Sequence, residues 1–312
     1  MITIRRYSAD MADAWNRFVA ASKNGTFLFD RGYMDYHSAR FTDHSMVVFR
    51  GEELYALLPA NQKADVLYTH QGLTYGGLVL GVEATMVHIM EAFDLLNAQF
   101  RSEGISRVVY KALPWIYHTH PAEEPLYAIF RNPHCRLIER DISTTVMIQQ
   151  PLKRKKDRRH GLMMAKKYGV VVNRSEDYAS FWPVLTNNLR ERHGVSPVHS
   201  LDEILLLHSR FPHQIQLFTA TLDGTLLAGC VVYVTGQVVH TQYIAATSEG
   251  KRLGAVDAIV DTLINGQFPH HPYLDFGKST ETHSDQLNAN LLYQKEGFGG
   301  RAVCYDTYEW TL

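Results

Sequence analysis

The residues best suited to proton transfer lie close together near the end of the chain. Tyr293 belongs to the segment A-N-L-L-Y-Q-K-E-G-F-G-G (289–300). A tyrosine with a pKa of about 10 stays protonated at neutral pH, so it can donate a proton. Glu281 and His283 follow a short predicted strand (273–277), at the kind of sheet edge where ligands of open α/β sheets bind. From this segment alone, the favoured interpretation of Tyr293 is a surface aromatic with a hydrated hydroxyl, and a proton donor is the alternative. Glu281 and His283 are candidate bases.

Two charged residues around the same strand suit other roles. Asp275 lies inside Y-L-D-F-G, where a structural role as partner of its own turn is favoured over that of a base. Lys278 follows the strand directly, and it either contacts an acidic substrate or is solvated. We include Lys278 among the predicted substrate-binding residues.

The segment I-A-A-T-S-E-G-K-R-L-G-A (244–255) combines small side chains, glycines and cations. Exposed amides and the helix dipole at the start of a helix attract a negative group. The predicted ligand contacts are Ala245, Ala246, Thr247, Gly250, Lys251, Arg252, Gly254 and Ala255. The alternative is an ordinary solvated helix start.

The first half offers an aromatic and imidazole cluster in P-W-I-Y-H-T-H-P-A-E-E (114–124). Tyr117 and His118 are the predicted substrate-binding residues of this cluster, lining a cleft that faces the second half. His118, His120 and Glu123 are residue types that bind metals, but a loop at this spacing is a poor template. We therefore predict no metal.

Charge is balanced over the whole chain and concentrated in one segment. Lys plus Arg number 31 and Asp plus Glu number 32 in 312 residues, so no global field recruits nucleic acid or an anionic membrane. The segment L-K-R-K-K-D-R-R-H (152–160) is strongly basic. Such a run is usually a solvated helix face, and the alternative is a contact for a polyanion such as tRNA.

Neither a membrane span nor a leader is predicted. The longest apolar run (226–234) has nine residues, about half of what a spanning helix needs. Cys230 lies in that run and is predicted to be buried in the second sheet. The first residues lack the apolar segment of a signal peptide, and three scattered cysteines favour a reducing compartment. We predict a soluble, cytoplasmic protein.

The two halves of the chain repeat one order of elements. A strand is followed by two helices, three antiparallel strands, a long helix, a strand, a short helix and a closing strand or hairpin. The long helices, at 86–100 and from about 253, carry apolar residues at helical spacing. We predict a mixed α/β protein with domains at 1–150 and 151–312, joined by a basic helix at 152–168.

This order, and the segment around Tyr293, resemble the GNAT acyltransferase superfamily. A-N-L-L-Y-Q-K-E-G-F fits the family pattern A-x-x-L-Y-x-K-x-G-F at every specified position. In that family the tyrosine commonly protonates the departing coenzyme A thiolate, a role that the resemblance gives to Tyr293. The basic helix, L-D-F-G-K-S-T-E (274–281) and the K-E-G-F-G-G end (295–300) look like segments of the tandem-GNAT, FemABX-like proteins.

The resemblance implies an N-acyltransferase with its site in the second domain. Acetyl-CoA or another acyl-CoA would be the co-substrate, and the acceptor would be an amine of a small molecule or a peptide. The small residues at 245–247 would admit the pantetheine arm. The first domain lacks a counterpart of the anion segment, so we predict no cofactor there.

The phosphate loop departs from the family pattern, R/Q-x-x-G-x-G/A. With Ala255 at the last position, Leu253 stands where glycine belongs and Arg252 lies off the pattern. Two alternatives therefore stay open. One is an aminoacyl-tRNA-dependent FemABX-type transferase that acts on a peptidoglycan precursor, which the basic helix favours. The other is a non-catalytic binding protein on a GNAT scaffold, which the missing glycine favours.

Overall fold

The computed structural model describes residues 1–281 and 286–312, without the side chains of residues 192 and 193. Its helices and strands alternate in the mixed α/β order that the sequence predicts, so the predicted fold class is confirmed. Within these residues, no helix has both the length and the apolar character that crossing a membrane requires.

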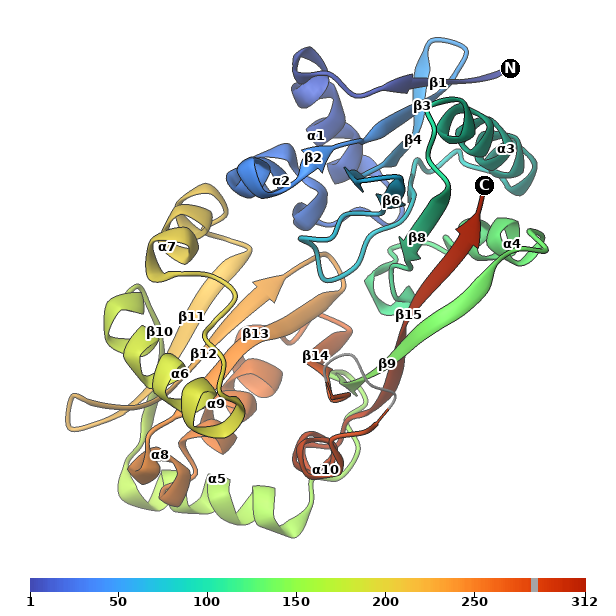
Figure 1. Cartoon of the computed structure of the whole chain (residues 1–312). Helices are drawn as coiled ribbons and strands as arrows, with labels where there is room; N and C mark the ends of the chain where they lie inside the picture. Colours follow the sequence, from blue (N-terminus) through green and yellow to red (C-terminus); the bar gives the residue numbers. More distant parts are fainter. Residues whose placement is uncertain (282–285) are drawn as a thin grey trace. The chain divides into compact units, whose positions relative to one another are not determined.

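The chain forms two compact units (Figure 1). Unit 1 comprises Met1–Asp141 and Cys304–Leu312, and unit 2 comprises Ile142–Val303. The expected boundary is 150/151, whereas the units divide inside β9, at 141/142, and the end of the chain belongs to unit 1. The last strand pairs there with a strand of the first half, a long-range choice that local sequence patterns do not encode.

Unit 1 is built from short elements and one long helix. In chain order they are β1 (Ile2–Arg6), the 3₁₀-helix η1 (Ala9–Met11), α1 (Ala12–Ala21), η2 (Phe27–Phe29), α2 (Arg31–Met34), η3 (Asp35–Arg40), β2 (Thr42–Asp43), β3 (Met46–Arg50), β4 (Glu53–Leu58), β5 (Asn61–Lys63), β6 (Val66–Tyr68), β7 (Val79–Leu80), α3 (Met86–Ser102), β8 (Arg107–Lys111), η4 (Trp115–Tyr117), α4 (Glu124–Phe130), the first part of β9 (Arg136–Met147) and the last part of β15 (Arg301–Thr311).

Two groups of strands form the sheets of unit 1. β1, β3, β4 and β7 are antiparallel neighbours. In the second group, β15, β8, β6, β5 and β2 lie in that order, and β6 and β8 run parallel. The apolar stripe of α3 packs into the core of this unit, as its helical spacing predicts. Its buried members are Ile89, Phe93, Leu96 and Phe100.

Unit 2 carries longer strands. Its elements are the second part of β9, α5 (Lys156–Tyr168), β10 (Val171–Ser175), α6 (Tyr178–His193), α7 (Leu201–Arg210), β11 (Ile215–Leu222), β12 (Thr225–Val234), β13 (Val238–Ala246), α8 (Ser248–Arg252), α9 (Ala255–Thr262), the π-helical turn η5 (Leu263–Gln267), β14 (Tyr273–Lys278), α10 (Ala289–Glu296) and the first part of β15.

The sheet of unit 2 has the order β10-β11-β12-β13-β14-β9, in which β13 and β14 run parallel. Figure 1 shows β11, β12 and β13 side by side, as their pairing requires. Alternate residues of β12 face opposite sides. Gly229 leaves room for the Phe181 ring of α6, and Cys230 is fully buried in the core that contains Ile259 of α9. The predicted burial of Cys230 is confirmed.

β9 is a single strand of twelve residues, whereas the sequence predicts a hairpin over 135–150. Its second part pairs with β14. In its first part, Arg140 forms two hydrogen bonds with the Asp306 carboxylate of β15, at 2.7 and 2.8 Å. Partners distant in sequence hold β9 extended, so no turn forms within it.

Candidate active site

The strands β13 and β14 separate at one edge of unit 2. They pair over three residues, and the last pair is His240 with Asp275. Beyond it, β13 continues beside β12, while β14 shifts its register against β9. Gly277 lies in the shifted part with a φ of +72°, a conformation that favours glycine. In open α/β sheets, ligands bind where neighbouring strands part at their carboxyl ends, so this edge is the candidate active site.

Asp275 is fully buried at this edge. Its Oδ1 accepts hydrogen bonds from the hydroxyls of Ser143 and Thr145, and its Oδ2 lies 2.8 Å from His240 Nδ1. Burial acts to raise the pKa of this carboxyl, but His240 and the two hydroxyls together lower it below its usual value. Asp275 is therefore ionised and accepts the Nδ1–H of His240. These partners lie on β9 and β13 and not in the turn of Asp275 that the sequence suggests. Sequence reasoning missed His240.

Lys295 is a second residue at this edge that sequence reasoning missed. It lies on α10, and its Nζ donates to the carbonyl oxygens of Gly277 at 2.8 Å and Lys278 at 2.7 Å. Burial lowers its pKa to about 8, against the opposing effect of Asp275. An amine with such a pKa changes protonation near neutral pH. The available signal was its place two residues after Tyr293, within the matched segment.

Tyr293 lies on the exposed side of α10, with 56% of its surface accessible. The Nζ of Lys155 stands 3.5 Å from the centroid of its ring, within cation–π range. The sequence predicts that Leu292 faces the core, but Leu292 is only half-buried. Phe298 anchors this end of the helix, because its ring stacks on that of Phe276 with centroids 5.2 Å apart.

The glycines after α10 differ from the expectation. The sequence predicts a left-handed helix end at Gly297, but its φ is −57° and Gly299 takes the positive value of +94°. A Cβ on Gly299 would overlap the carbonyl of Leu152. A close approach of two backbone segments therefore requires glycine at 299.

The amides of the predicted anion site have partners within unit 2. Thr247 caps α8, and its Oγ1 accepts the N–H of Gly250 at 3.0 Å. The N–H groups of Lys251 and Leu253 donate to the carbonyls of Thr247 and Glu249 at 3.0 and 2.9 Å. In this conformation those amides are already used.

α5 covers the start of α9. A Cβ on Gly254, whose φ is +70°, would overlap the carbonyl of Gly161. Arg158 pairs with Asp257 at 3.2 Å, and burial raises the pKa of Asp257 to about 6 although Arg158 opposes this change. Ala255 is fully buried. A helix–helix contact thus stands where the sequence predicts phosphate.

The other predicted ligand contacts lie in two environments. Ala245 and Ala246 are buried in β13, so their side chains pack inside unit 2. Lys251 and Arg252 are exposed, and Arg252 pairs with Glu249 at 3.2 Å.

Of the residues predicted at and after the end of β14, Lys278 and Glu281 are exposed. The N–H of Glu281 donates to the carbonyl of Gln286 at 2.9 Å. Lys278 is brought to the candidate active site through its carbonyl, which Lys295 holds. His283 lies outside the described residues.

In unit 1, Tyr117 occupies a different place from the predicted cleft. It is 2% exposed, its hydroxyl lies 3.1 Å from that of Tyr305, and its ring packs on Tyr75. The aromatic residues around it, rather than a ligand, fill its surroundings. His118 is half-buried, and burial lowers its pKa to about 4, so it is neutral at neutral pH.

Unit 1 also contains a parallel strand pair, β6 and β8, but the segment after β6 fills the space beside it. The N–H of Gly76 donates to the carbonyl of Lys111 at 3.2 Å, and the N–H of Lys111 donates to Thr69 Oγ1 at 2.9 Å. The Nζ of Lys111 donates to the carbonyl of Leu73 at 2.9 Å. A Cβ on Gly76 would overlap the carbonyl of Thr69. The glycine-rich segment from Thr69 to Gly77 thus packs tightly into the space beside β6 and β8, and we call it the plug of unit 1.

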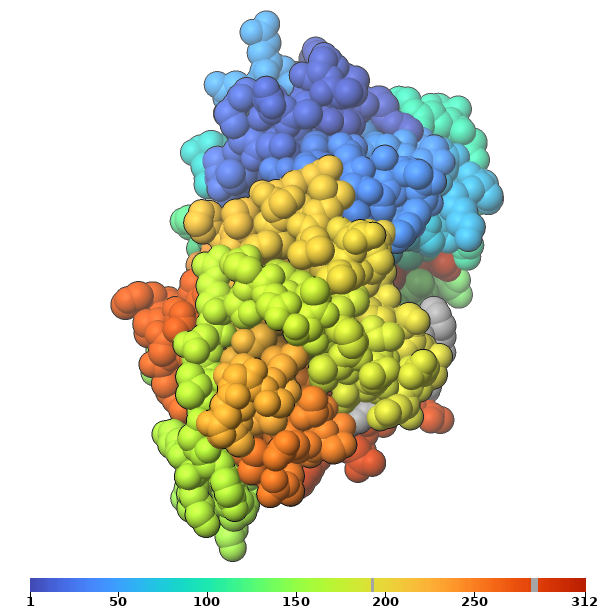
Figure 2. Space-filling view, turned by 90° about the vertical axis from the view of Figure 1, so that its left-hand side faces the viewer, coloured from blue at the N-terminus to red at the C-terminus, as the bar shows by residue number. Residues whose placement is uncertain are grey.

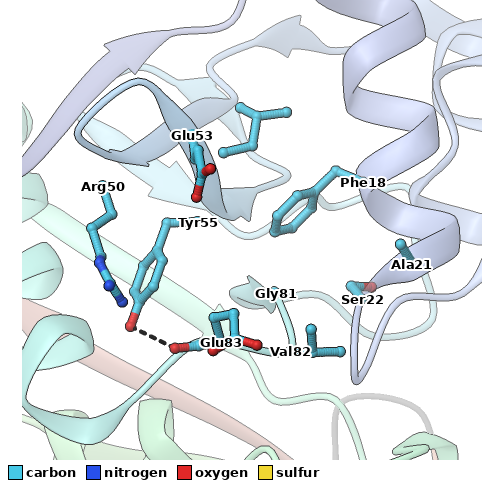
Figure 3. A pocket seen from close by; sticks show the side chains of 10 residues that line it. Phe18, Ala21, Ser22, Arg50, Glu53, Tyr55, Gly81, Val82 and Glu83 are labelled. Carbon is cyan, nitrogen blue, oxygen red and sulfur yellow. Dashed lines mark hydrogen bonds between the residues drawn. The ribbon is translucent and has the colours of Figure 1, made fainter.

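A cavity of about 200 Å³ in unit 1 lies between Phe18, Arg50, Glu53 and Tyr55. Figure 3 shows the Tyr55 hydroxyl bonded to the carbonyl of Glu83 at its rim. Neither Tyr117 nor His118 lines this cavity. Across the described parts of both units, no three His, Cys, Asp or Glu side chains gather as a metal would need.

Comparison with known proteins identifies the second half of the chain. Residues 153–283, less than half of the sequence, match the model of the acetyltransferase (GNAT) domain family. A search of curated proteins finds no significant match.

Solved structures resemble nearly the whole chain at low identity. FemX has a TM-score of 0.72 at 12% identity, over 99% of this chain and 97% of that one. The C-terminal domain of a protein described as a lysylphosphatidylglycerol synthetase, from Agrobacterium fabrum, has a TM-score of 0.62 at 12% identity, over 96% and 91%. L-PGS from Bacillus licheniformis has 0.59 at 12% identity, over 97% and 92%. Residues 153–283 therefore carry a GNAT acetyltransferase domain, and the chain as a whole has a FemX-like fold.

Proposed function

We propose that unit 2 transfers an acyl group from an activated ester or thioester to an amine, at the edge where β13 and β14 separate. The observation that carries this proposal is Lys295, an amine fixed at that edge by the carbonyls of Gly277 and Lys278. Attack by an amine creates negative charge on the acyl oxygen, and a positioned donor stabilises that charge most where little water is present. The ammonium of Lys295 is such a donor.

Tyr293 is the proposed proton donor to the leaving group. Its exposure gives a large donor access to the ring. The Lys155 ammonium, 3.5 Å from the ring centroid, holds the ring by a cation–π contact. The acyl carbon would then be attacked near Lys295, while the leaving oxygen or sulfur takes a proton from Tyr293.

We favour an aminoacyl-tRNA as the donor. Coenzyme A needs a grip for its pyrophosphate, and the amides between Gly250 and Gly254 have partners or lie under α5. By contrast, α5 and the residues before it, light green in Figure 2, carry several exposed cations. These exposed cations are Lys153, Lys156, Arg159, Lys166 and Lys167. The FemABX resemblance implies a peptidoglycan precursor as the amine acceptor.

An acyl-CoA donor is the second candidate. The matched family model is that of an acetyltransferase domain, and Lys251 and Arg252 remain exposed beside α8. Coenzyme A would then be held by these side chains instead of by amides.

The two donors can be separated by product and by variant. We would incubate the purified chain with acetyl-CoA, longer acyl-CoAs and charged tRNA, each with lysine-containing peptides and amino sugars, and detect amide products by mass spectrometry. We expect product from charged tRNA. Product from an acyl-CoA alone would favour the second candidate, and no product from any donor would contradict the proposed function.

Binding to the donor gives an independent test. Replacing Lys153, Lys156 and Arg159 by alanine should weaken tRNA binding and lower the slope of log K against log salt by about one for each phosphate that is no longer neutralised. Lys251→Ala with Arg252→Ala is the matched control, because it removes cations from the same unit. If only this control weakens binding, the tRNA surface does not lie on α5.

A further inference from the structure

One row of polar side chains crosses the sheet of unit 2 at the strand separation. His240, Asp275 and Thr145 stand opposite one another in the register of β13, β14 and β9. The residues directly before His240 and Asp275, Val239 and Leu274, belong to the apolar core that α9 covers. Because neighbouring residues of a strand face opposite sides, the polar row lies on the other face.

From this row we infer that His240 is the base that deprotonates the amine acceptor and that Asp275 positions it. The inference rests on the proposed function and adds the residue that activates the nucleophile. Sequence reasoning placed the base on the loop after β14, at Glu281 or His283, whereas the row places it on β13.

The hydrogen bonds of Asp275 define which ring nitrogen can act. Oδ2 accepts Nδ1–H of His240 at 2.8 Å, and Oδ1 is held by Ser143 and by Thr145 at 2.8 Å. With Nδ1 protonated, the lone pair of the neutral imidazole is on Nε2. An ionised carboxylate that orients the ring and stabilises the imidazolium is the arrangement by which histidine works as a base.

His240 also lies beside the peptide that Lys295 holds. A Cβ on Gly277 would come to 3.1 Å from Cε1 of His240, and the carbonyl of Gly277 accepts a hydrogen bond from Lys295. The side chain of His240 is 12% exposed. The proposed base, His240, and the proposed oxyanion donor, Lys295, thus both lie beside Gly277, where β13 and β14 separate.

The step balances without a further reagent. Nε2 takes one proton from the acceptor ammonium and passes it to solvent after the reaction. The neutral amine attacks the acyl carbon, forming the C–N bond. The tetrahedral intermediate collapses by breaking the bond to the leaving oxygen or sulfur. Tyr293 protonates that atom and regains a proton from the former amine, so the products are the amide and the free leaving group.

The test compares two histidines of unit 2 that both contact a carboxylate. His208 contacts Glu176 through Nε2 and the carbonyl of Ile215 through Nδ1, at 2.8 Å. We expect His240→Gln to lower kcat by about 10²–10⁴-fold, the range of general acid–base catalysis, with a smaller change in KM. His208→Gln should leave kcat unchanged. Asp275→Asn should lower kcat by about 10–100-fold, as loss of an orienting partner does.

Two further measurements distinguish a catalytic role of His240 from a purely structural one. Added imidazole should restore part of the activity of His240→Ala and none of that of Asp275→Asn. The thermal unfolding midpoint of His240→Gln should stay close to that of the wild type. A folded His240→Gln variant that turns over like the wild type would overturn the inference.

The ring tautomer tests the pair independently of turnover. ¹⁵N NMR of histidine-labelled protein should show that Nδ1 of His240 carries the proton and that Nε2 is unprotonated, and Asp275→Asn should disturb this distribution. The opposite tautomer in the wild type would overturn the inference. A wild type that is inactive with every donor but has the expected tautomer would contradict the proposed function and support the role of Asp275 in positioning His240.

Discussion

Unit 1 and unit 2 each contain a short parallel strand pair, and they treat the space beside it differently. In unit 1 the segment from Thr69 to Gly77 returns to this space, and Gly76 donates to the carbonyl of Lys111. In unit 2 the strands part after His240 and Asp275, and their polar side chains lie at the separation. One element order therefore serves packing in one unit and, as we propose, chemistry in the other.

The lysines beside the two strand pairs sharpen this contrast. The Nζ of Lys111 binds carbonyls of the segment that fills unit 1. The Nζ of Lys295 binds the carbonyls of Gly277 and Lys278, and its pKa is lowered to about 8 by burial. A lysine that donates to two backbone carbonyls fixes a loop in unit 1, whereas in unit 2 it places a titratable amine at the sheet edge. Variants of corresponding residues in the two units test this difference.

The largest effect is expected at Tyr293. Its counterpart in the first half is Tyr127, because each tyrosine follows a leucine on the short helix before the last strand of its half. Tyr293→Phe keeps the ring and removes the proton donor, so kcat should fall by about 10²–10⁴-fold, while donor affinity changes by no more than about tenfold. Tyr127→Phe, on α4 of unit 1 and 48% exposed, is the control and should have no effect. Equal activity of both variants would make Tyr293 a surface aromatic.

The two lysines come next. Lys295→Met should lower kcat by about 10²–10³-fold, the usual loss for one oxyanion donor. Lys111→Met should leave kcat unchanged and destabilise the protein by about 1–3 kcal/mol, because it leaves buried carbonyls without a partner. Steady-state kinetics and denaturant unfolding measure the two quantities. A catalytic loss in Lys111→Met would show that unit 1 takes part in the reaction.

The plug of unit 1 is tested by its tightest glycine. Gly76→Ala places a methyl group against the carbonyl of Thr69, so it should lower the free energy of unfolding by about 1–3 kcal/mol. Gly266→Ala in unit 2 meets no atom closer than 4.0 Å and should be neutral. If Gly76→Ala is equally neutral, the segment does not fill this space tightly in solution.

The smallest effect is a difference in pH response. Burial lowers the pKa of His70 and His118 in unit 1 to about 3 and about 4. The unfolded chain binds these protons from about pH 6.5 downward, so unit 1 loses stability as the pH falls, by about 1 kcal/mol per histidine at pH 5.5. Asp257 of unit 2, with its pKa raised to about 6, has the opposite sign, since stability falls as the pH rises from about 4 to 6.

Hydrogen exchange of the two units at pH 7.5 and 5.5 measures this difference. Peptides of unit 1 should lose protection first in acid. His70→Asn should reduce this loss of protection, because it removes the imidazole that takes up a proton on unfolding. Asparagine is chosen because it tolerates the positive φ of 70° at this position. Earlier loosening of unit 2 would contradict the assignment.

The sequence was informative where a pattern is local. The apolar stripe of α3 is found as predicted. The hairpin expected in 135–150 is wrong, because β9 is held straight by partners more than a hundred residues away. Helices and turns are determined largely by residues that are neighbours in the sequence, whereas strand pairing depends on residues that are distant in it.

The same limit explains the site. Tyr293 was identified from a contiguous motif, and Lys295 lay in that motif without a sign that it would be buried. His240 and Asp275 are 35 residues apart and become partners only through the register of two strands. A polar residue inside each of two apolar runs, V-V-H and L-D-F, was the available signal, but nothing in either run indicates the other.

The passage of β9 and β15 through both units has a consequence for synthesis. Unit 1 contains the first 141 residues, but it also needs Cys304–Leu312, of which Thr307–Thr311 pair with β8. A ribosome makes these residues only after all of unit 2. Unit 1 is therefore begun before unit 2 and completed after it, and until then β8 presents an unpaired edge to other chains. Unit 2 is therefore synthesised while unit 1 still lacks the last part of β15.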